Sequence, residues 1–436
     1  MRSRVLLVFL SALCGTVLSA AAPRPGSVIF IHPDGTALNT WNVARIYHAG
    51  PDGMLEWDHL PQVGLYRSHF KNSLAPTSHG GGTVHAWGVK VGRDSYGMDG
   101  RTPIKSRSGV DRSVMQEAGA AGLAVGIVNT GHLAEPGTGV FLASSERRND
   151  YTGIARTIVE SGADVILAGG EIYLLPAGVL GRHGAPGVRD DGRDLIAAAR
   201  AAGYTVVYNR YELLAAAANP TVKRLLGVFA ATDTYNDAAE EDLAAAGRPL
   251  YKLGTPDVAD MTAAALQVLE RIGQRFLLVV EEEGTDNFAN KHNAAGTLEA
   301  LRRADAAIGV ARRYLATHPG TLVLTAADSD AGGMQLIPAG RQNDPAEPAP
   351  VLPGVTAIGN PVDGVAGTGT AAFLSAPDRA GVRFWFGVAW GGPDDMIGGV
   401  VARAAGLNAE RLRVNLDNTQ LYDLMWETLF GRELPE

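Results

Sequence analysis

The chain alternates short apolar runs with longer segments of helical periodicity along most of its 436 residues. Such runs, bounded by turn residues, are typical of buried strands, and apolar residues at helical spacing predict the helices between them. The predicted strands are 28–31, 63–66, 124–128, 164–167, 205–208, 276–280, 321–325, 371–374 and 383–388, and the predicted helices are 152–161, 195–202, 258–272 and 295–315. This order predicts an α/β fold in which helices cover both faces of a largely parallel sheet.

Two stretches interrupt this alternation, at about 173–193 and 333–363. Both are rich in Gly and Pro, which predicts surface loops inserted into the fold rather than linkers between domains. We therefore expect residues 23–436 to form a single domain with two loop insertions.

Residues 1–22 have the pattern of a signal peptide. Arg2 and Arg4 precede an apolar run at 5–18, and small residues follow it. Because the run is shorter than the roughly 20 residues of a membrane span, we expect cleavage, a secreted or periplasmic protein, and no stable membrane insertion afterwards. Cys14, the only cysteine, would be removed with this segment. A metal site would then use oxygen and imidazole ligands.

Charge excludes one class of partner. The net charge is −8 and no basic run occurs in the sequence. Because nucleic acid is bound through clustered Lys and Arg, we do not expect it as a partner.

Polar residues follow two of the predicted strands at the points where they end. Asp34 and Gly35 come after 28–31, where the carboxylate could bind a cation or the pair could simply form a turn. Ser78 precedes a glycine run at 80–82, which favours either a helix start whose N–H groups stabilise an anion or a flexible loop. Each segment is a candidate site with a structural alternative.

Carboxylates follow two later strands. The segment 281–286 holds four of them directly after 276–280, and Asp328 follows 321–325. Carboxylates beside buried strands are costly unless water or a cation neutralises them, so a solvated acidic loop and a metal site are the alternatives. Since the carboxyl ends of parallel strands meet at one edge of a sheet, a shared metal site is favoured.

Taken together and in this order, the segments resemble the alkaline phosphatase family from about residue 27 to residue 430. The match includes the strand 28–31 with Asp34-Gly35 and Ala44-Arg45-Ile46-Tyr47, the Gly-rich strand end 164–170, the segment 225–230 and the helix that begins near Met261. The resemblance implies an alkaline-phosphatase-like three-layer sandwich whose central sheet is largely parallel.

The resemblance also implies metal ligands. Asp34 falls on the carboxylate that bridges two metals in the family, and Asp328 falls on a carboxylate of the second zinc site. Glu281 and Asp286 fall on the carboxylates of the magnesium site and the first zinc site. Glu135 takes the place of a hydroxyl residue that binds magnesium.

Ser78 falls on the family's nucleophile, ten residues before Gly88. Because a metal activates that hydroxyl in the family, Ser78 also counts among the metal ligands. The arginine that clamps phosphate should follow Pro136 by about ten residues, where Arg147 and Arg148 compete. The spacing to the next helix favours Arg148.

The sequence departs from the family at its zinc ligands. Asn290, Ser329 and Gly367 stand where three histidines are expected, and Thr77 replaces the acid before the nucleophile. We expect Asn290 and Ser329 still to contribute oxygen ligands. Oxygen-rich sites suit hard cations, so we predict Mg²⁺ first, with Mn²⁺, Ca²⁺ or Zn²⁺ at the second site. Displaced histidines could compensate, and the candidates are His79, His85, His132 and His292.

The function implied is hydrolysis of small phosphate monoesters through a phosphoserine, by a chain that is expected to act outside the cytoplasm. A sulfatase is disfavoured, because the residues after Ser78 lack the Cys/Ser-x-Pro-x-Arg context. The alternatives are a phosphodiesterase of the same fold and a non-catalytic protein that binds phosphate or metal. A homodimer is an assembly that the resemblance allows.

Overall fold

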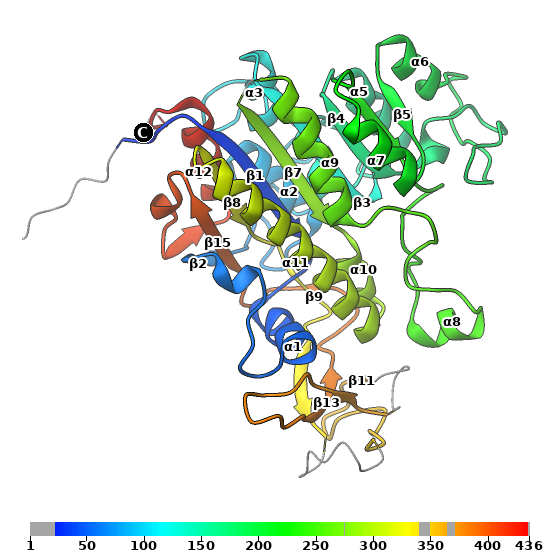
Figure 1. The fold of residues 1–436 in the computed structure, drawn as a ribbon, viewed down its shortest axis with the longest axis vertical. Helices are drawn as coiled ribbons and strands as arrows, with labels where there is room; N and C mark the ends of the chain where they lie inside the picture. The colour runs from blue at the N-terminus through cyan, green and yellow to red at the C-terminus, as the bar shows by residue number, and fades with distance from the viewer. Residues whose placement is uncertain (1–21, 274, 340–348, 364–370, 435–436) are drawn as a thin grey trace, which may run out of the picture.

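The computed structural model describes residues 22–273, 275–339, 349–363 and 371–434. Its main sheet has ten strands in the order β16-β2-β15-β8-β1-β7-β3-β4-β6-β5 (Figure 1). In that order the strands are Asn415–Asp417, Gln62–Arg67, Val401–Gly406, Thr321–Thr325, Ser27–Pro33, Phe276–Glu282, Ala124–His132, Val165–Gly169, Leu225–Val228 and Thr205–Val207. β15 pairs antiparallel with β2 and β8, and the other pairs are parallel. The predicted largely parallel sheet is confirmed.

Helices cover both faces of this sheet, as the side chains of β1 show. Val28 and Phe30 contribute to one hydrophobic core, while Ile29 and Ile31 contribute to the other. Because successive strand residues point to opposite faces, this division requires a packed layer on each side. It also explains why β1 is a continuous apolar run rather than an alternating one. The predicted three-layer α/β architecture is confirmed.

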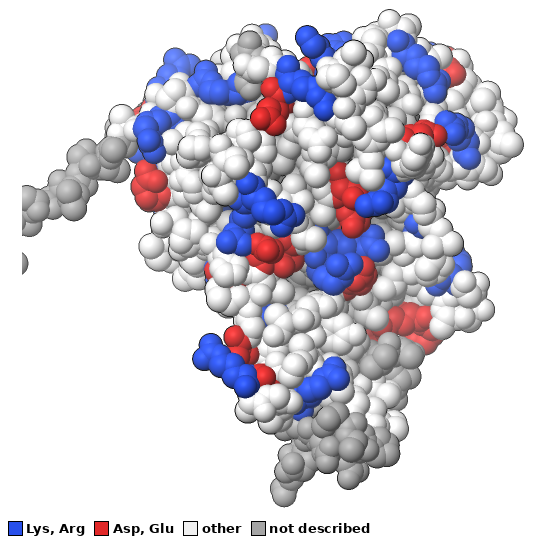
Figure 2. Space-filling view, in the orientation of Figure 1, with Lys and Arg blue, Asp and Glu red and all other residues white. Residues whose placement is uncertain are grey.

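The two outer layers contain different helices. α1 (Leu38–His48), α7 (Arg210–Ala218), α9 (Val258–Arg271) and α11 (Ala294–Thr317) contribute to the core that holds Ile29. α2 (Ser78–Trp87), α3 (Val114–Ala120), α5 (Tyr151–Glu160), α6 (Leu195–Ala201) and α12 (Gln420–Phe430) contribute to the core that holds Val28. In Figure 1, α9 and α11 cross in front of the sheet. On this face Lys and Arg lie interspersed with Asp and Glu (Figure 2), as the ion pairs of Glu299 with Arg302 and Arg303 on α11 illustrate.

The region predicted as a loop at 333–363 is partly strand. β10 (Gln335–Pro338) and β11 (Val362–Asp363) both pair with β13 (Trp385–Ala389) in a second, smaller sheet. The strand predicted at 371–374 is β12 (Phe373–Leu374) of this small sheet. Sequence reasoning missed β15, whose Ala- and Gly-rich residues have low strand propensity.

The remaining elements are short. η1 (Trp57–His59), η2 (Glu171–Tyr173) and η3 (Ala409–Arg411) are 3-10 turns; α4 (Pro136–Gly139), α8 (Glu240–Ala245) and α10 (Gly284–Asn290) are short helices; β9 (Asp330–Ala331) pairs with β14 (Asp395–Met396). Within 173–193, Pro176 bridges to Arg189.

The signal-peptide prediction falls on residues outside the described ranges, except for Ala22, and Gly367 lies outside them too. Among the helices described, none has the length and apolar character to cross a membrane. The single-domain organisation stays a prediction.

Candidate active site

The predicted metal-binding carboxylates meet at one edge of the main sheet. β8, β1 and β7 are neighbours, and Asp328, Asp34 and Glu281 stand at or just beyond their carboxyl ends. Asp286, on α10, lies close enough to Asp34 and Asp328 for their charges to raise its pKa. Residues far apart in the sequence therefore form one acidic cluster.

Many polar atoms of this cluster are buried without a hydrogen-bond partner. Asp34, Glu281 and Asp328 are at most 1% exposed. The unpartnered atoms at this edge are Asp34 Oδ2, Glu283 Oε2, Asp286 Oδ1, Asn290 Oδ1, both carboxylate oxygens of Asp328 and Ser329 Oγ. Buried polar atoms in native proteins nearly always have partners, so these oxygens are arranged for groups that would bind between them. Divalent cations fit such a set of oxygens.

The electrostatics of the acidic cluster lead to the same conclusion. Burial raises the pKa of Asp328 well above its usual range, and the charge of Asp34 raises it further. Burial likewise raises the pKa of Glu283, with added repulsion from Glu135 and Glu281. A divalent cation between these carboxylates would offset both the cost of burying them and their mutual repulsion.

The three consecutive glutamates, Glu281 to Glu283, do not share the same surroundings. Glu281 Oε1 lies 3.2 Å from His32 Nδ1, and Glu281 and Glu283 both offer an oxygen to a group that includes Asp34. Glu282 has different neighbours, since its Oε1 accepts hydrogen bonds from the Thr130 hydroxyl at 2.8 Å and the Tyr251 hydroxyl at 2.9 Å. Alternation along the end of β7 separates Glu282 from the other two.

Asp395 is a residue of the site that the sequence did not single out. Its Oδ1 lies 3.4 Å from Asn290 Nδ2, which also donates to Asp286 Oδ2 at 2.9 Å. Burial raises the pKa of Asp286, and the Asp395 charge is the next cause. β14 pairs with β9, and this places Asp395 near Asp286 and Asn290. No local pattern around Asp395 signals this role, because the pairing is long-range.

Ser78 is the first residue of α2, and Thr77 is its N-cap. The Thr77 hydroxyl accepts from Gly80 N at 3.5 Å and also donates to the carbonyl of Arg93. The Thr77 hydroxyl therefore has a structural role as the helix cap, whereas Ser78 is partly exposed. Of the two sequence alternatives, the helix start is the one found.

The glycine run allows α2 to lie against the acidic cluster. A Cβ on Gly81 would lie 2.0 Å from Asp328 Oδ2, and one on Gly82 would lie 2.5 Å from the Pro136 carbonyl oxygen. Ser78 is three residues before Gly81 and therefore lies on the same side of the helix. The absence of side chains here brings the first turn of α2 up to Asp328.

Arg148, the phosphate-binding arginine predicted from the sequence, has an alternative in Arg93. Arg148 pairs with Asp94 at 2.7 Å on the surface, where both side chains are well exposed, and its charge is felt by His79. Arg147 is also exposed. Arg93 has a buried Nε without a partner in the described structure, and its charge counteracts the raised pKa of Asp395.

The four histidines considered as replacement ligands have distinct environments. Burial lowers the pKa of His79 to about 3, and His85 Nε2 lies 2.7 Å from the Tyr66 hydroxyl. His292 stacks on Trp390 and has φ of 55°, with Nε2 buried and unpartnered. The imidazole that lies inside the cluster is instead His32. Its position at the carboxyl end of β1, two residues before Asp34, is the signal that could have revealed it.

Glu135 belongs to the edge of the cluster. Its charge raises the pKa of Glu283, and its Oε1 lies 2.8 Å from His132 Nε2. His132, Glu135 and Asp233 each offer one ligand atom within 4.8 Å of the others. The His132 ring contacts the rings of Tyr151 and Tyr173, which also contact each other.

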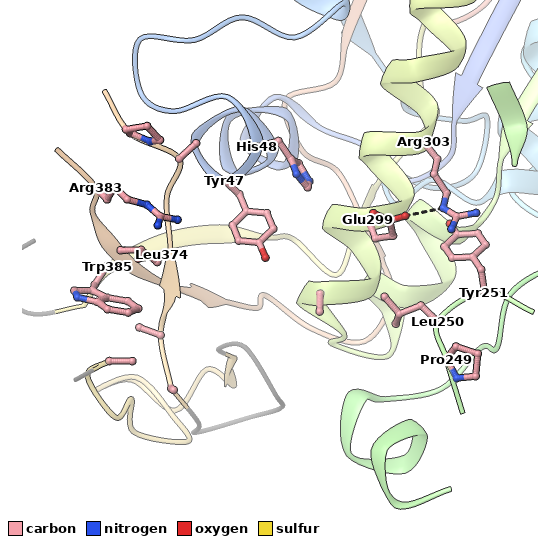
Figure 3. A pocket seen from close by; sticks show the side chains of 16 residues that line it. Tyr47, His48, Pro249, Leu250, Tyr251, Glu299, Arg303, Leu374, Arg383 and Trp385 are labelled. Carbon is pink, nitrogen blue, oxygen red and sulfur yellow. Dashed lines mark hydrogen bonds and ion pairs between the residues drawn. The ribbon is translucent and has the colours of Figure 1, made fainter. Parts of the chain in front are cut away.

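A large hollow of about 1220 Å³ lies elsewhere (Figure 3). Tyr47 comes from α1 and Arg303 from α11, and the Arg303 guanidinium lies 3.5 Å from the centre of the Tyr251 ring. The carboxylates of the acidic cluster do not line this hollow. Tyr251 links the two regions, because its hydroxyl bonds to Glu282.

These features place the chain among α/β proteins with a carboxylate cluster suited to divalent cations at the carboxyl edge of the sheet. A family model described as alkaline phosphatase matches residues 26–343. The chain belongs to the alkaline phosphatase family. That family is metal-dependent, and the acidic groups described above are this chain's candidates for metal binding.

Individual alkaline phosphatases are also similar in sequence to this chain. The tissue-nonspecific alkaline phosphatase of Gallus gallus is 28% identical over 69% of this chain and 63% of that protein. A membrane-bound alkaline phosphatase of Bombyx mori is 26% identical over 72% of this chain and 62% of that protein. The chain thus spans less than two thirds of the length of these relatives.

Solved structures share the fold. Thermus thermophilus alkaline phosphatase superposes with a TM-score of 0.72 at 23% identity, covering 99% of this chain and 97% of that one. The alkaline phosphatase of the Antarctic bacterium TAB5 superposes with a TM-score of 0.69 at 17% identity, covering 94% of this chain and 100% of that one.

Proposed function

We propose that this chain is a metal-dependent phosphomonoesterase that acts outside the cytoplasm on small phosphate monoesters, through a phosphoserine at Ser78. One observation carries the proposal: unpartnered, buried carboxylate oxygens gather where the first turn of α2 lies against Asp328. A nucleophile beside a cluster of cation-binding oxygens is what phosphoryl transfer requires.

The residues proposed to hold metal are the sequence-predicted carboxylates together with Asn290, Ser329 and the newly found Asp395. Divalent cations bound there would neutralise the carboxylates and polarise phosphoryl oxygens. Mg²⁺ suits the all-oxygen part of this set. A solved mutant of the TAB5 enzyme has Mg bound in its M3 site, which supports the choice for a relative of this fold.

The chain's own residues have separate proposed tasks. The Ser78 oxygen forms a bond to phosphorus as the bond to the alcohol breaks, and the alcohol leaves with a proton. Water then breaks the phosphoserine and releases inorganic phosphate. The free N–H groups at the start of α2 and the Arg148 guanidinium would stabilise the phosphoryl oxygens, with Arg93 as the inner alternative. Asp94 would have to release Arg148.

A diesterase of the same fold is the second candidate, because the family and fold support hydrolysis at phosphorus without distinguishing monoesters from diesters. The test is hydrolysis of p-nitrophenyl phosphate against its bis ester, over a panel of metals added to chelated protein. We expect the monoester to be the better substrate by at least about tenfold in kcat/KM. A preference for the bis ester would replace the first proposal with the second.

The nucleophile is tested by two neighbouring substitutions. Ser78→Ala should lower kcat by at least about 1000-fold, since it removes the covalent route. Thr77→Ala removes the cap of α2 and should cost about 1 kcal/mol of stability with a much smaller loss of kcat. The measurements are steady-state kinetics and thermal unfolding. Activity that survives in Ser78→Ala but disappears in Thr77→Ala would move the nucleophile by one residue.

A further inference from the structure

His32 is an imidazole enclosed by the acidic cluster. Its ring is fully buried, with Nδ1 3.2 Å from Glu281 Oε1. Its Nε2 has no hydrogen-bond partner in the described structure and lies 3.7 Å from Asp34 Oδ1 and 3.8 Å from Asp328 Oδ1. The free nitrogen therefore faces two carboxylates at distances too long for hydrogen bonds.

The sheet fixes this arrangement. His32 lies directly opposite Glu281 in the parallel pairing of β1 with β7, and Asp34 is the first residue after the end of β1. The rings of Phe30 and His85 lie 6.0 Å and 5.5 Å from the His32 ring. These ring contacts, together with the bond to Glu281, hold the plane of the imidazole, so its nitrogens have fixed directions.

Glu281 selects the tautomer of His32. Asn129 Nδ2 donates to Glu281 Oε2, which leaves Oε1 to accept from His32 Nδ1. With its proton on Nδ1, the ring presents the lone pair of Nε2 to the gap between Asp34 and Asp328. Metal-binding histidines commonly have this second hydrogen bond to a carboxylate, which orients the ring and makes it a better ligand.

The spacing of the three ligand atoms also suits one cation. Two ligands at about 2.0–2.2 Å from a shared cation lie roughly 3.0–3.6 Å apart. The two distances from His32 Nε2 are slightly longer than this, so a small inward movement of the carboxylates would complete the site. Neighbouring Ser329 adds a buried hydroxyl without a partner.

We propose that His32 supplies the imidazole ligand of a cation shared with Asp34 and Asp328, and that Glu281 orients His32. This inference rests on the metal centre of the proposed function and deepens it, because the site gains the nitrogen that Asn290, Ser329 and Gly367 do not supply. Two carboxylates and an imidazole suit a borderline cation, Zn²⁺ above all. The oxygen-only part of the cluster around Glu283 keeps its preference for Mg²⁺.

The test uses His32→Asn in the full chain, because the Asn amide can still donate to Glu281 but has no counterpart of Nε2. Chelated wild-type protein and the variant are titrated with Zn²⁺ and with Mg²⁺ by calorimetry. Cu²⁺ is used separately as a probe, and pulsed electron paramagnetic resonance detects a directly bound imidazole. We expect Zn²⁺ affinity at one site to fall at least about 10–100-fold, with Mg²⁺ affinity changed less than about threefold.

Three further variants make the result specific. His292→Asn tests an imidazole that, like His85 and His132 in the described structure, has a buried ring nitrogen without a partner. His318→Asn controls for loss of a surface histidine that pairs with Glu270. His32→Gln provides a second test if His32→Asn does not fold. The imidazole signal should disappear only in the His32 variants. A signal that persists there, or that disappears in His292→Asn, overturns the proposal.

Catalysis is read separately from binding. A wild-type imidazole signal that depends on His32, in a protein with no hydrolysis of p-nitrophenyl phosphate, would leave this inference standing and refute the proposed function. Hydrolysis by wild-type protein without such a signal would refute this inference and leave the proposed function standing.

Discussion

Two regions bury carboxyl groups against each other, and they differ in what surrounds them. At the edge of the main sheet, Asp34, Asp328 and their neighbours carry oxygens without hydrogen-bond partners and enclose His32. At the start of α11, Glu240 and Asp363 are both buried and carry backbone partners. Ala294 N donates to Asp363 Oδ2 at 2.8 Å, and Ala295 N donates to Glu240 Oε1 at 2.9 Å.

The second region is satisfied without a cation. Burial, followed by the charge and hydrogen bond of Asp363, raises the pKa of Glu240 to about 10. One proton shared by the pair, together with the N–H groups of the helix start, balances the remaining charge. A buried acidic group is thus not a metal site in itself. In the pair at α11, one oxygen of each carboxyl accepts from a helix-start N–H, and a proton shared between Glu240 and Asp363 serves the other oxygens. Both oxygens of Asp328, in contrast, lack a hydrogen-bond donor.

The largest expected effect tests this distinction at Asp328. Asp328→Asn should lower kcat at least about 100-fold in the metal-loaded enzyme. The amide has nearly the size of the carboxylate but removes its charge as a metal ligand. In metal-free protein at pH 8, the same change should raise the free energy of unfolding by about 1–3 kcal/mol, because a buried charge is removed. Kinetics and urea unfolding measure the two effects.

If Asp328→Asn instead destabilised the metal-free protein, the cluster would be held by protons and hydrogen bonds, like the pair at α11. Glu240→Gln serves as the comparison for catalysis. Its kcat should stay within about twofold of wild type, since its hydrogen bonds in the described structure are to the start of α11 and to Asp363, away from the predicted ligands.

A second prediction concerns the close approach of α2 to Asp328. Gly81→Ala would place Cβ 2.0 Å from Asp328 Oδ2, so the helix or the carboxylate must move. A displacement of about 1 Å at a reacting centre costs on the order of 100-fold in rate. We expect a loss of 10–100-fold in kcat/KM, as an order-of-magnitude estimate, together with lower thermal stability.

Gly119→Ala, in α3, is the matched control, because the nearest atom to its Cβ would be 3.9 Å away. This change should stabilise the protein by about 0.5–1 kcal/mol and leave kcat unaffected. Equal activity in the two variants would show that the distance between α2 and Asp328 does not matter for catalysis.

The smallest expected effect is the pH dependence that Glu240 contributes. The folded state keeps a proton on Glu240 up to about pH 10, while the unfolded chain loses it near the ordinary pKa of about 4.3. Folding therefore takes up a proton between these values, and stability falls as pH rises, by at most about 1.4 kcal/mol per pH unit.

Glu240→Gln removes this contribution and keeps an oxygen for Ala295 N. In metal-loaded protein, urea unfolding at pH 7, 8 and 9 should give a flatter decline for the variant than for wild type. Parallel declines would mean that the pair does not share a proton.

Much of the fold was predictable because its signals are local. Apolar runs such as 276–280 form buried strands wherever they are placed in a parallel sheet, and polar residues that follow such strands reach one edge. That rule by itself predicts that Asp34, Asp286 and Asp328 lie together. It did not find β15, whose Ala-rich strand forms because β2 and β8 pair with it.

The candidate site was predictable only as far as local order extends. Sequence reasoning counted the family's missing histidines at 290, 329 and 367, but it did not consider His32, which lies in the middle of the cluster. Asp395 was also absent from the predicted set, because it reaches Asn290 through the pairing of β14 with β9. Such pairing depends on the whole sheet and not on spacing along the chain.

The sequence by itself determined the α/β alternation, the acidic strand ends and the family. Only the tertiary structure decided which nitrogen of His32 is free, that Glu282 turns away from Glu281 and Glu283, and that Asp395 joins Asp286. The physical reason is that residue spacing sets which side of a strand or helix a group occupies. Which groups on other strands and helices it meets there depends on strand order and packing.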